Sequence, residues 1–224
     1  MERHSPRIDP RRARTRRALL RAGEALLISH AIEVVSVDDI VKTAGVTRGS
    51  FYNHFEDKEA LAREISRNVR LAGEAMVDAA NEGISDPAER VARALAIFVH
   101  FSTVEPLRAR SMVRLFAGAT ALPLADVNIG VLADVARGLE EGRFRGPSLQ
   151  SGILLIIGIV QMSILYLLES TRPVATEAFA AELAADLLRG LGVDPTQVTA
   201  IGRRAARDVF ADGARLQARL DPLD

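Results

Sequence analysis

The sequence predicts an all-α fold, and three observations support this prediction. Apolar side chains recur at steps of three and four residues along most of the chain, which is the period of an amphipathic helix. The 224 residues include only 16 Gly and 9 Pro, so long uninterrupted helices can form. No stretch alternates apolar and polar residues as a half-buried strand does, and no internal repeat is present. With 48% hydrophobic residues, the chain can build a sizeable core in one large or two small domains.

The N-terminal end is expected to be a basic arm followed by a helix. Residues 1–10 hold two Pro and few apolar side chains, which is typical of a flexible arm. A first helix is expected over residues 11–30. Its inward positions are Leu19 or Leu20, Gly23, and Leu26 or Leu27.

Residues 36–58 carry the punctuation of two short helices separated by a tight turn. Ser36 is a favourable N-cap with Asp39 three residues later, as in a capping box. Gly45 can adopt the positive φ that a turn after a helix requires. Thr47 is a second N-cap, and Phe51 begins a second buried stripe that Phe55 continues. This is the pattern of a helix–turn–helix, in which the second helix enters the major groove of DNA.

Further helices are expected from capping signals downstream. Asp57 can cap a long helix over residues 58–81, and the Asp86–Pro87 pair can start the next. The expected helices after it end near Val104, near Gly118, near Gly142, near Ser170 and near residue 191. A last helix is expected over 195–220, broken near Gly213.

The wording of residues 36–61 is more specific than a generic helix–turn–helix. Ser36-Val-Asp-Asp-Ile, Ala44-Gly-Val-Thr, Phe51-Tyr-Asn-His-Phe and Lys58-Glu-Ala-Leu resemble the tetracycline-repressor (TetR) family over roughly residues 15–65. Departures from the family pattern are Gly23, Ala31, Val35 and Val41. The resemblance implies a DNA-binding domain at 11–57, a ligand-binding and dimerisation domain at 58–194, and a C-terminal extension at 195–224.

The resemblance also implies which residues contact an operator. The expected DNA-binding set is Ser36, Thr47, Arg48, Gly49, Ser50, Tyr52, Asn53, His54 and Lys58. Arg48 is expected to read guanine through a bidentate contact, while Tyr52, His54 and Lys58 are expected to donate to phosphates. Other roles remain open: Tyr52 covering the small core, His54 packing in it, and Asn53 merely solvated.

The charge distribution favours DNA although the formal net charge is zero. Residues 1–70 hold 14 Lys and Arg against 10 Asp and Glu, and the rest of the chain holds 15 against 19. Within residues 1–21 there are eight Arg and two acidic residues. A basic arm beside a helix–turn–helix attracts the phosphate backbone.

Residues 152–168 contain no charged side chain, which also permits a transmembrane reading. A helix buried between the core and a partner subunit has the same composition. The resemblance implies that this helix and the next form a four-helix interface in a homodimer, and no membrane association is expected. The small residues expected there are Gly152, Gly158, Ser163, Ala178, Ala181 and Ala185.

An effector cavity is expected between the long helix and the 147–170 helix. Its expected lining is Met76, Phe98, Phe101, Met112, Leu115, Phe116, Gln161 and Tyr166. Large apolar groups with a few polar fixers are typical of small-molecule sites, so a mostly apolar effector is expected. For Phe and Met, membership of the ordinary core is the alternative.

The predicted function is a homodimeric, ligand-responsive transcriptional repressor on a pseudo-palindromic double-stranded DNA operator, in a bacterial cytoplasm at the nucleoid. The four His are scattered, no Cys is present, and there is no P-loop or dinucleotide motif, so neither catalysis, nor a metal, nor a cofactor is expected. Two alternatives are a non-specific architectural DNA-binding protein and a membrane-associated helical protein.

Overall fold

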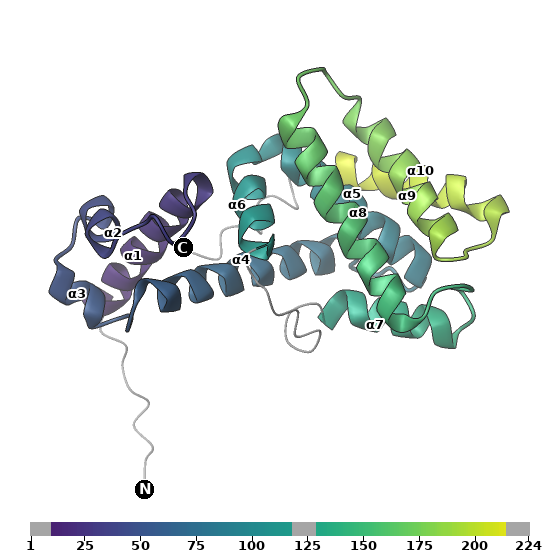
Figure 1. Ribbon diagram of the computed structural model, residues 1–224. Coiled ribbons are helices and arrows are strands. Elements are labelled where there is room, and N and C mark those ends of the chain that lie inside the picture. Colours follow the sequence, from purple (N-terminus) through teal and green to yellow (C-terminus); the bar gives the residue numbers. More distant parts are fainter. Residues whose placement is uncertain (1–9, 118–128, 214–224) are drawn as a thin grey trace, which may run out of the picture. The chain divides into compact units, whose positions relative to one another are not determined.

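The computed structural model describes residues 10–117 and 129–213, without the side chains of 115–117, and this part of the chain is all helical. Its helices are α1 (Pro10–Ser29), α2 (Val37–Ala44), α3 (Arg48–Tyr52), α4 (Lys58–Ala80), α5 (Pro87–Val104), α6 (Pro106–Ala117), α7 (Ile129–Glu140), α8 (Leu149–Glu169), α9 (Thr176–Gly190) and α10 (Pro195–Ala211). Figure 1 shows them in order. The all-α prediction is confirmed. The arm expected at 1–10 lies, except for Pro10, outside the described residues.

The chain divides into two compact units, with the boundary between Asn68 and Val69 inside α4. The sequence placed the domain boundary at residues 57–58 instead. The reason for the difference is that the first turns of α4 belong to the core of the N-terminal unit: Leu61 and Ile65 are almost fully buried.

The N-terminal unit is built around one small apolar core. Its largest buried side chains come from four helices: Leu19, Leu27, Ile40, Phe51, Phe55, Leu61 and Ile65. A Cβ on Gly23 would lie 2.8 Å from side-chain atoms of both Leu61 and Ile65. Gly23 therefore lets α1 approach α4 closely, which accounts for this departure from the family pattern.

The C-terminal unit is organised around α5. Helices α6, α7, α8, α9 and α10 all contact it, and Figure 1 shows α8 and α9 side by side. Eleven of the 18 residues of α5 are buried, which is expected for a helix surrounded by neighbours.

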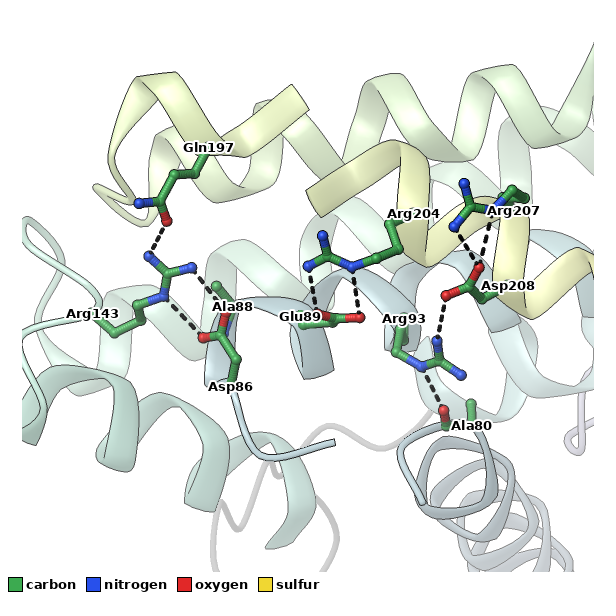
Figure 2. Close-up of polar contacts among 10 residues, drawn as sticks. All are labelled: Ala80, Asp86, Ala88, Glu89, Arg93, Arg143, Gln197, Arg204, Arg207 and Asp208. Atoms are coloured by element: carbon green, nitrogen blue, oxygen red, sulfur yellow. Dashed lines mark hydrogen bonds and ion pairs between the residues drawn. The ribbon is translucent and has the colours of Figure 1, made fainter. Parts of the chain in front are cut away.

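Arginine contacts fasten α10 to the start of α5, as Figure 2 shows. Arg204 makes a two-pronged contact with Glu89, at 3.1 and 2.6 Å. The buried Arg93 donates to the carbonyl of Ala80 at 2.6 Å and lies 3.6 Å from Asp208. Bidentate guanidinium–carboxylate pairs are directional as well as attractive, so they fix the position of α10 along α5.

Small residues let α10 lie directly on α9. A Cβ on Gly202 would lie 2.6 Å from the carbonyl oxygen of Ala181 and 3.1 Å from the amide nitrogen of Ala185. Part of the small-residue face of α9 is therefore covered within the subunit. The sequence predicted α10 as an extension but not this packing.

Candidate nucleic-acid interface and effector cavity

The turn between α2 and α3 has the geometry that its sequence predicts. Ser36 accepts a bond from the amide of Asp39, whose carboxylate accepts one from the Ser36 amide, so the capping box is complete. Hydrogen bonds from Ser36 hold the pKa of Asp39 below its usual value. Gly45 ends α2 with φ of +66°, in the left-handed region.

The start of α3 is open to solvent. Thr47 caps it by accepting a bond from the Ser50 amide at 3.2 Å. Thr47, Arg48 and Gly49 are exposed, and Ser50 is partly exposed. A Cβ on Gly49 would meet only the hydroxyl of Thr47, at 3.9 Å. Packing within the subunit therefore does not require glycine here, and a close approach of DNA is the remaining reason for it.

Arg48 is held ready at the surface by two neighbours. Its guanidinium lies 3.2 Å from the carboxylate of Asp38 on α2 and 6.0 Å from the ring centroid of Tyr52. A hydrogen bond to Tyr52, and then the charge of Asp38, raise the pKa of Arg48 further. Both partners are exposed, so the pair is weak and DNA can displace it.

The end of α3 presents three further side chains that the sequence selected. Tyr52 and Asn53 are exposed, and Tyr52 makes an edge contact with the buried ring of Phe51. Burial, and then the charges of Arg12 and Arg16, lower the pKa of His54. A neutral His54 donates through only one ring nitrogen.

Arg16 has a structural role that the sequence did not reveal. It pairs with Glu64, donates to the carbonyl of His54, and lies 4.8 Å from the ring centroid of Phe55. It therefore joins α1 to the end of α3 and to α4. Arg12, Arg14 and Arg17 on the same helix are exposed and provide positive charge at the surface.

The expected phosphate contact of Lys58 is corrected by the structure. Its ammonium donates to the carbonyls of Ile32, Glu33 and Val35 at 2.8, 3.2 and 2.9 Å. An ammonium has three N–H donors, and here each has an acceptor inside the protein. Lys58 therefore fastens the segment between α1 and α2 to the start of α4.

The C-terminal unit contains a cavity of about 430 Å³ enclosed by α4, α5, α7 and α8, with Met112 of α6 at its wall. This volume falls within the range of small-molecule sites. Its apolar lining includes Val69, Val77, Phe98, Met112, Ile156 and Val160.

The structure places three of the predicted effector residues at this cavity: Phe98, Met112 and Gln161. Met76 and Phe101 are instead core residues, 1% and 4% exposed. Tyr166 is 55% exposed and packs on Phe179, so its assignment to the cavity was wrong. Helical spacing does not distinguish an inward residue that lines a cavity from one that fills the core. The side chains of Leu115 and Phe116 lie outside the described residues.

Sequence reasoning missed the polar wall of the cavity. Arg70, Glu74, Asp78, Arg90 and Asp134 all line it. Burial raises the pKa of Glu74, opposed by a hydrogen bond from the backbone of Ile129. A signal was available: Arg70 and Glu74 are four residues apart, next to the inward-facing Val69 and Val77.

The expected partner-facing surface differs from the observed free face of α8. Gly152 is buried against Val135, Ser163 is 4% exposed, and α10 covers Ala185. These three residues are therefore not available to a partner. Gly158 has open space around it, Ala178 is exposed and Ala181 is partly exposed.

The free face of α8 is apolar. Leu154, Met162 and Tyr166 are 52, 63 and 55% exposed, in line with Gly158. By length and composition α8 could cross a membrane; its mean hydropathy is 2.2, and 33% of its most apolar window is buried in the subunit. Exposed apolar patches of this kind mark interaction surfaces.

The described residues include no cluster of three or more His, Asp or Glu side chains that could hold a metal ion. The class of protein follows from the N-terminal unit, whose two capped helices and left-handed glycine turn form a helix–turn–helix joined to a second helical unit.

Comparison with known proteins agrees with this class. Residues 19–65 match the family model of bacterial regulatory proteins of the tetR family. The HTH-type transcriptional regulator EthR of Mycolicibacterium smegmatis is 32% identical over 95 residues, which are 42% of this chain and 44% of EthR. The chain thus matches less than half the length of this relative.

Two solved structures share the fold over most of the chain. RolR in complex with resorcinol aligns with a TM-score of 0.56 at 22% identity, over 87% of this chain and 95% of RolR. A gamma-butyrolactone receptor described as ArpA-like aligns with a TM-score of 0.63 at 20% identity, over 88% and 97%. The protein belongs to the TetR family of DNA-binding transcription regulators.

Proposed function

We propose that this protein is a homodimeric repressor that leaves a pseudo-palindromic operator when a small molecule occupies the cavity of its C-terminal unit. The observation that carries the proposal is that α4 begins at Lys58, directly after the helix–turn–helix, and runs without interruption to the cavity wall at Val69–Asp78. A ligand that binds this wall acts on the helix to which the DNA-binding elements are joined.

The DNA contacts proposed here follow the exposure of the α3 residues. Thr47, Arg48 and Ser50 would meet base edges or phosphates, with Arg48 exchanging Asp38 for guanine. Tyr52 and His54 would donate to phosphates and fix the register, while Asn53 would contact a base or a phosphate. The Ser36 side chain is the N-cap of α2, which would leave the amide end of that helix near the backbone of DNA.

Dimerisation would place two copies of α3 in successive major grooves. The free face of α8, with Gly158 and its apolar neighbours, would meet the same face of a second subunit, joined by Ala178 and Ala181 of α9. An isologous pairing of this kind covers an apolar surface that a monomer leaves in water.

Release from the operator requires the effector to bind one conformation better than the other, because equal affinity shifts nothing. The names of two structural neighbours mention resorcinol and gamma-butyrolactone, both small oxygen-containing molecules. A molecule of that general kind suits a 430 Å³ cavity with an apolar lining. Action on chromosomal DNA places the protein in the bacterial cytoplasm, at the nucleoid.

The deciding experiment is footprinting of the purified protein on the DNA that flanks its own gene. A protected pseudo-palindrome, with affinity roughly a thousandfold or more above that for random DNA, supports the proposal. Salt-dependent coating without a preferred site would support an architectural protein instead, and recovery of the protein in membranes would support the transmembrane alternative for α8.

The cavity assignment has its own variant. Gln161 lies at the cavity and is partly exposed. Gln161→Leu is expected to weaken effector response while operator affinity without effector stays within about twofold of wild type, because the amide lies away from α3. Loss of DNA binding together with loss of thermal stability would make Gln161 a structural core residue.

A further inference from the structure

The cavity contains two polar atoms that the folded chain leaves unused. The Nε of Arg70 and the Oε1 of Glu74 are both buried from solvent, and neither has a hydrogen-bond partner among the described residues. A buried polar atom without a partner costs about 1–3 kcal/mol, and more when the group is charged. Two such atoms in the wall of one cavity indicate that a third molecule supplies their partners.

The other charged pair at the cavity is already satisfied. Arg90 donates to Asp134 at 2.5 Å and also to the carbonyls of Asn81 and Ile84. Asp134 is 6% exposed and is joined to Arg90, so this pair connects α5 to α7. Within the described lining, the unused hydrogen-bonding capacity in buried atoms is therefore confined to Arg70 and Glu74.

The chemistry of the two atoms defines what can satisfy them. A guanidinium only donates, and a carboxylate only accepts. The two side chains are four residues apart on α4, so they share one face of the helix. A ligand group that meets both must accept a hydrogen bond and donate one, and a hydroxyl does this with a single oxygen atom.

We propose that the effector is an amphipathic neutral molecule whose hydroxyl group donates to Glu74 and accepts from Arg70, while its apolar body lies against the rest of the lining. This rests on the proposed function, in which this cavity is the effector site. The apolar body contacts Val69, Val77, Phe98, Met112, Ile156 and Val160.

Charged head groups fit this wall less well. An anion that approaches Arg70 also meets the carboxylates of Glu74 and Asp78, and a cation that approaches Glu74 meets Arg70. Each carries an unfavourable like-charge contact in a partly desolvated site. The pair therefore selects against a carboxylate or an ammonium at the polar end of the ligand, and against a hydrocarbon that leaves both atoms unpartnered.

The test uses three probes with one apolar body: para-butylphenol, its methyl ether and butylbenzene. Calorimetric titration of the full-length wild-type protein is expected to give a dissociation constant at least about tenfold lower for the phenol than for the other two. A site built for a hydroxyl discriminates against analogues that lack the donor, because its own polar groups are then left unpaired. The methyl ether retains an acceptor but not the donor, so it separates the contribution of Glu74 from that of Arg70.

Two variants assign the preference to these residues. Arg70→Met and Glu74→Met keep the length of the side chain and remove its polar head, and each is expected to reduce the phenol preference to about threefold or less. Butylbenzene affinity stays within about threefold of wild type, and the midpoint of thermal unfolding does not fall, because a buried unpartnered charge has been removed. Glu169→Gln, an exposed position at the end of α8, is the matched control and keeps the full preference.

Several results would overturn the hydroxyl site. They are equal binding of the three probes, absence of saturable phenol binding, a preference unchanged in both Met variants, or loss of stability in those variants. Operator anisotropy, measured separately, tests the proposed function: a phenol preference that depends on Glu74 without any operator found would refute the repressor and leave the hydroxyl site standing.

Discussion

Replacing Lys58 by Met separates a structural role of this residue from a role in DNA binding. The variant keeps the apolar stem and removes an ammonium that donates to three carbonyls between Ile32 and Val35, at 2.8 to 3.2 Å. A hydrogen bond to a charged group contributes about 1.5–3 kcal/mol. Lys58 is only partly buried and water replaces part of each contact, so we expect the whole variant to lose about 2 kcal/mol of unfolding free energy.

Urea denaturation of the full-length protein measures this loss, and hydrogen exchange locates it. The amides of residues 31–36 should lose protection before those of α5, because the ammonium holds that segment to α4. Lys42, the other lysine of the chain, is exposed on α2 and provides the control. Lys42→Met should change the unfolding free energy by less than about 0.5 kcal/mol.

The refuting result concerns salt. A lysine that binds phosphate contributes about 0.9 to the slope of log K against log salt. If Lys58→Met left the unfolding free energy within about 0.5 kcal/mol of wild type and flattened the operator salt slope by about one, the ammonium would bind DNA, and the structural reasoning would be wrong.

Three further predictions address other parts of the protein. Arg48→Ala should cost about 1–3 kcal/mol at one operator position, and an unchanged ranking of operator variants in a binding competition would show that Arg48 reads no base. Gly158→Arg should give monomers or aggregates in sedimentation, because it places an unpaired charge in an apolar interface, while Gly146→Arg, in an open loop, should sediment as wild type does. Burial lowers the pKa of His100, which packs 4.8 Å from Phe210. The unfolded chain therefore takes up the proton first as pH falls below about 6.5, and stability decreases by up to about 1.4 kcal/mol per pH unit until the folded pKa is reached. His100→Gln should remove that part of the decrease in denaturation curves measured from pH 7 to pH 5, and an unchanged curve would contradict it.

The tertiary structure changed the assignment of several residues that the sequence had selected by type. Gly152, Ser163 and Ala185 are small residues on helices expected at a dimer interface, yet each is buried within its own subunit. A small residue permits close packing but does not specify the neighbour. The neighbour in the case of Ala185 is Gly202, on a helix 17 residues further along the chain.

The helix boundaries of the DNA-binding unit were determined by the sequence itself. The bonds between Ser36 and Asp39, between Thr47 and Ser50, and from Ala60 to Asp57 each span three residues. Such caps depend on side chains and amides that are adjacent in the chain, so residue type and spacing are sufficient to predict them. The apolar period, which is equally local, determined the all-α fold.

The function of individual polar side chains was decided only by the folded chain. Lys58 reaches carbonyls more than 20 residues earlier, and Arg70 and Glu74 become notable only because α5, α7 and α8 enclose them without offering a partner. Whether a polar group is solvated, satisfied or left for a ligand depends on desolvation and on atoms contributed by distant segments. No pattern within a single helix contains that information, which is why the sequence located the effector cavity approximately and missed its hydrogen-bonding wall.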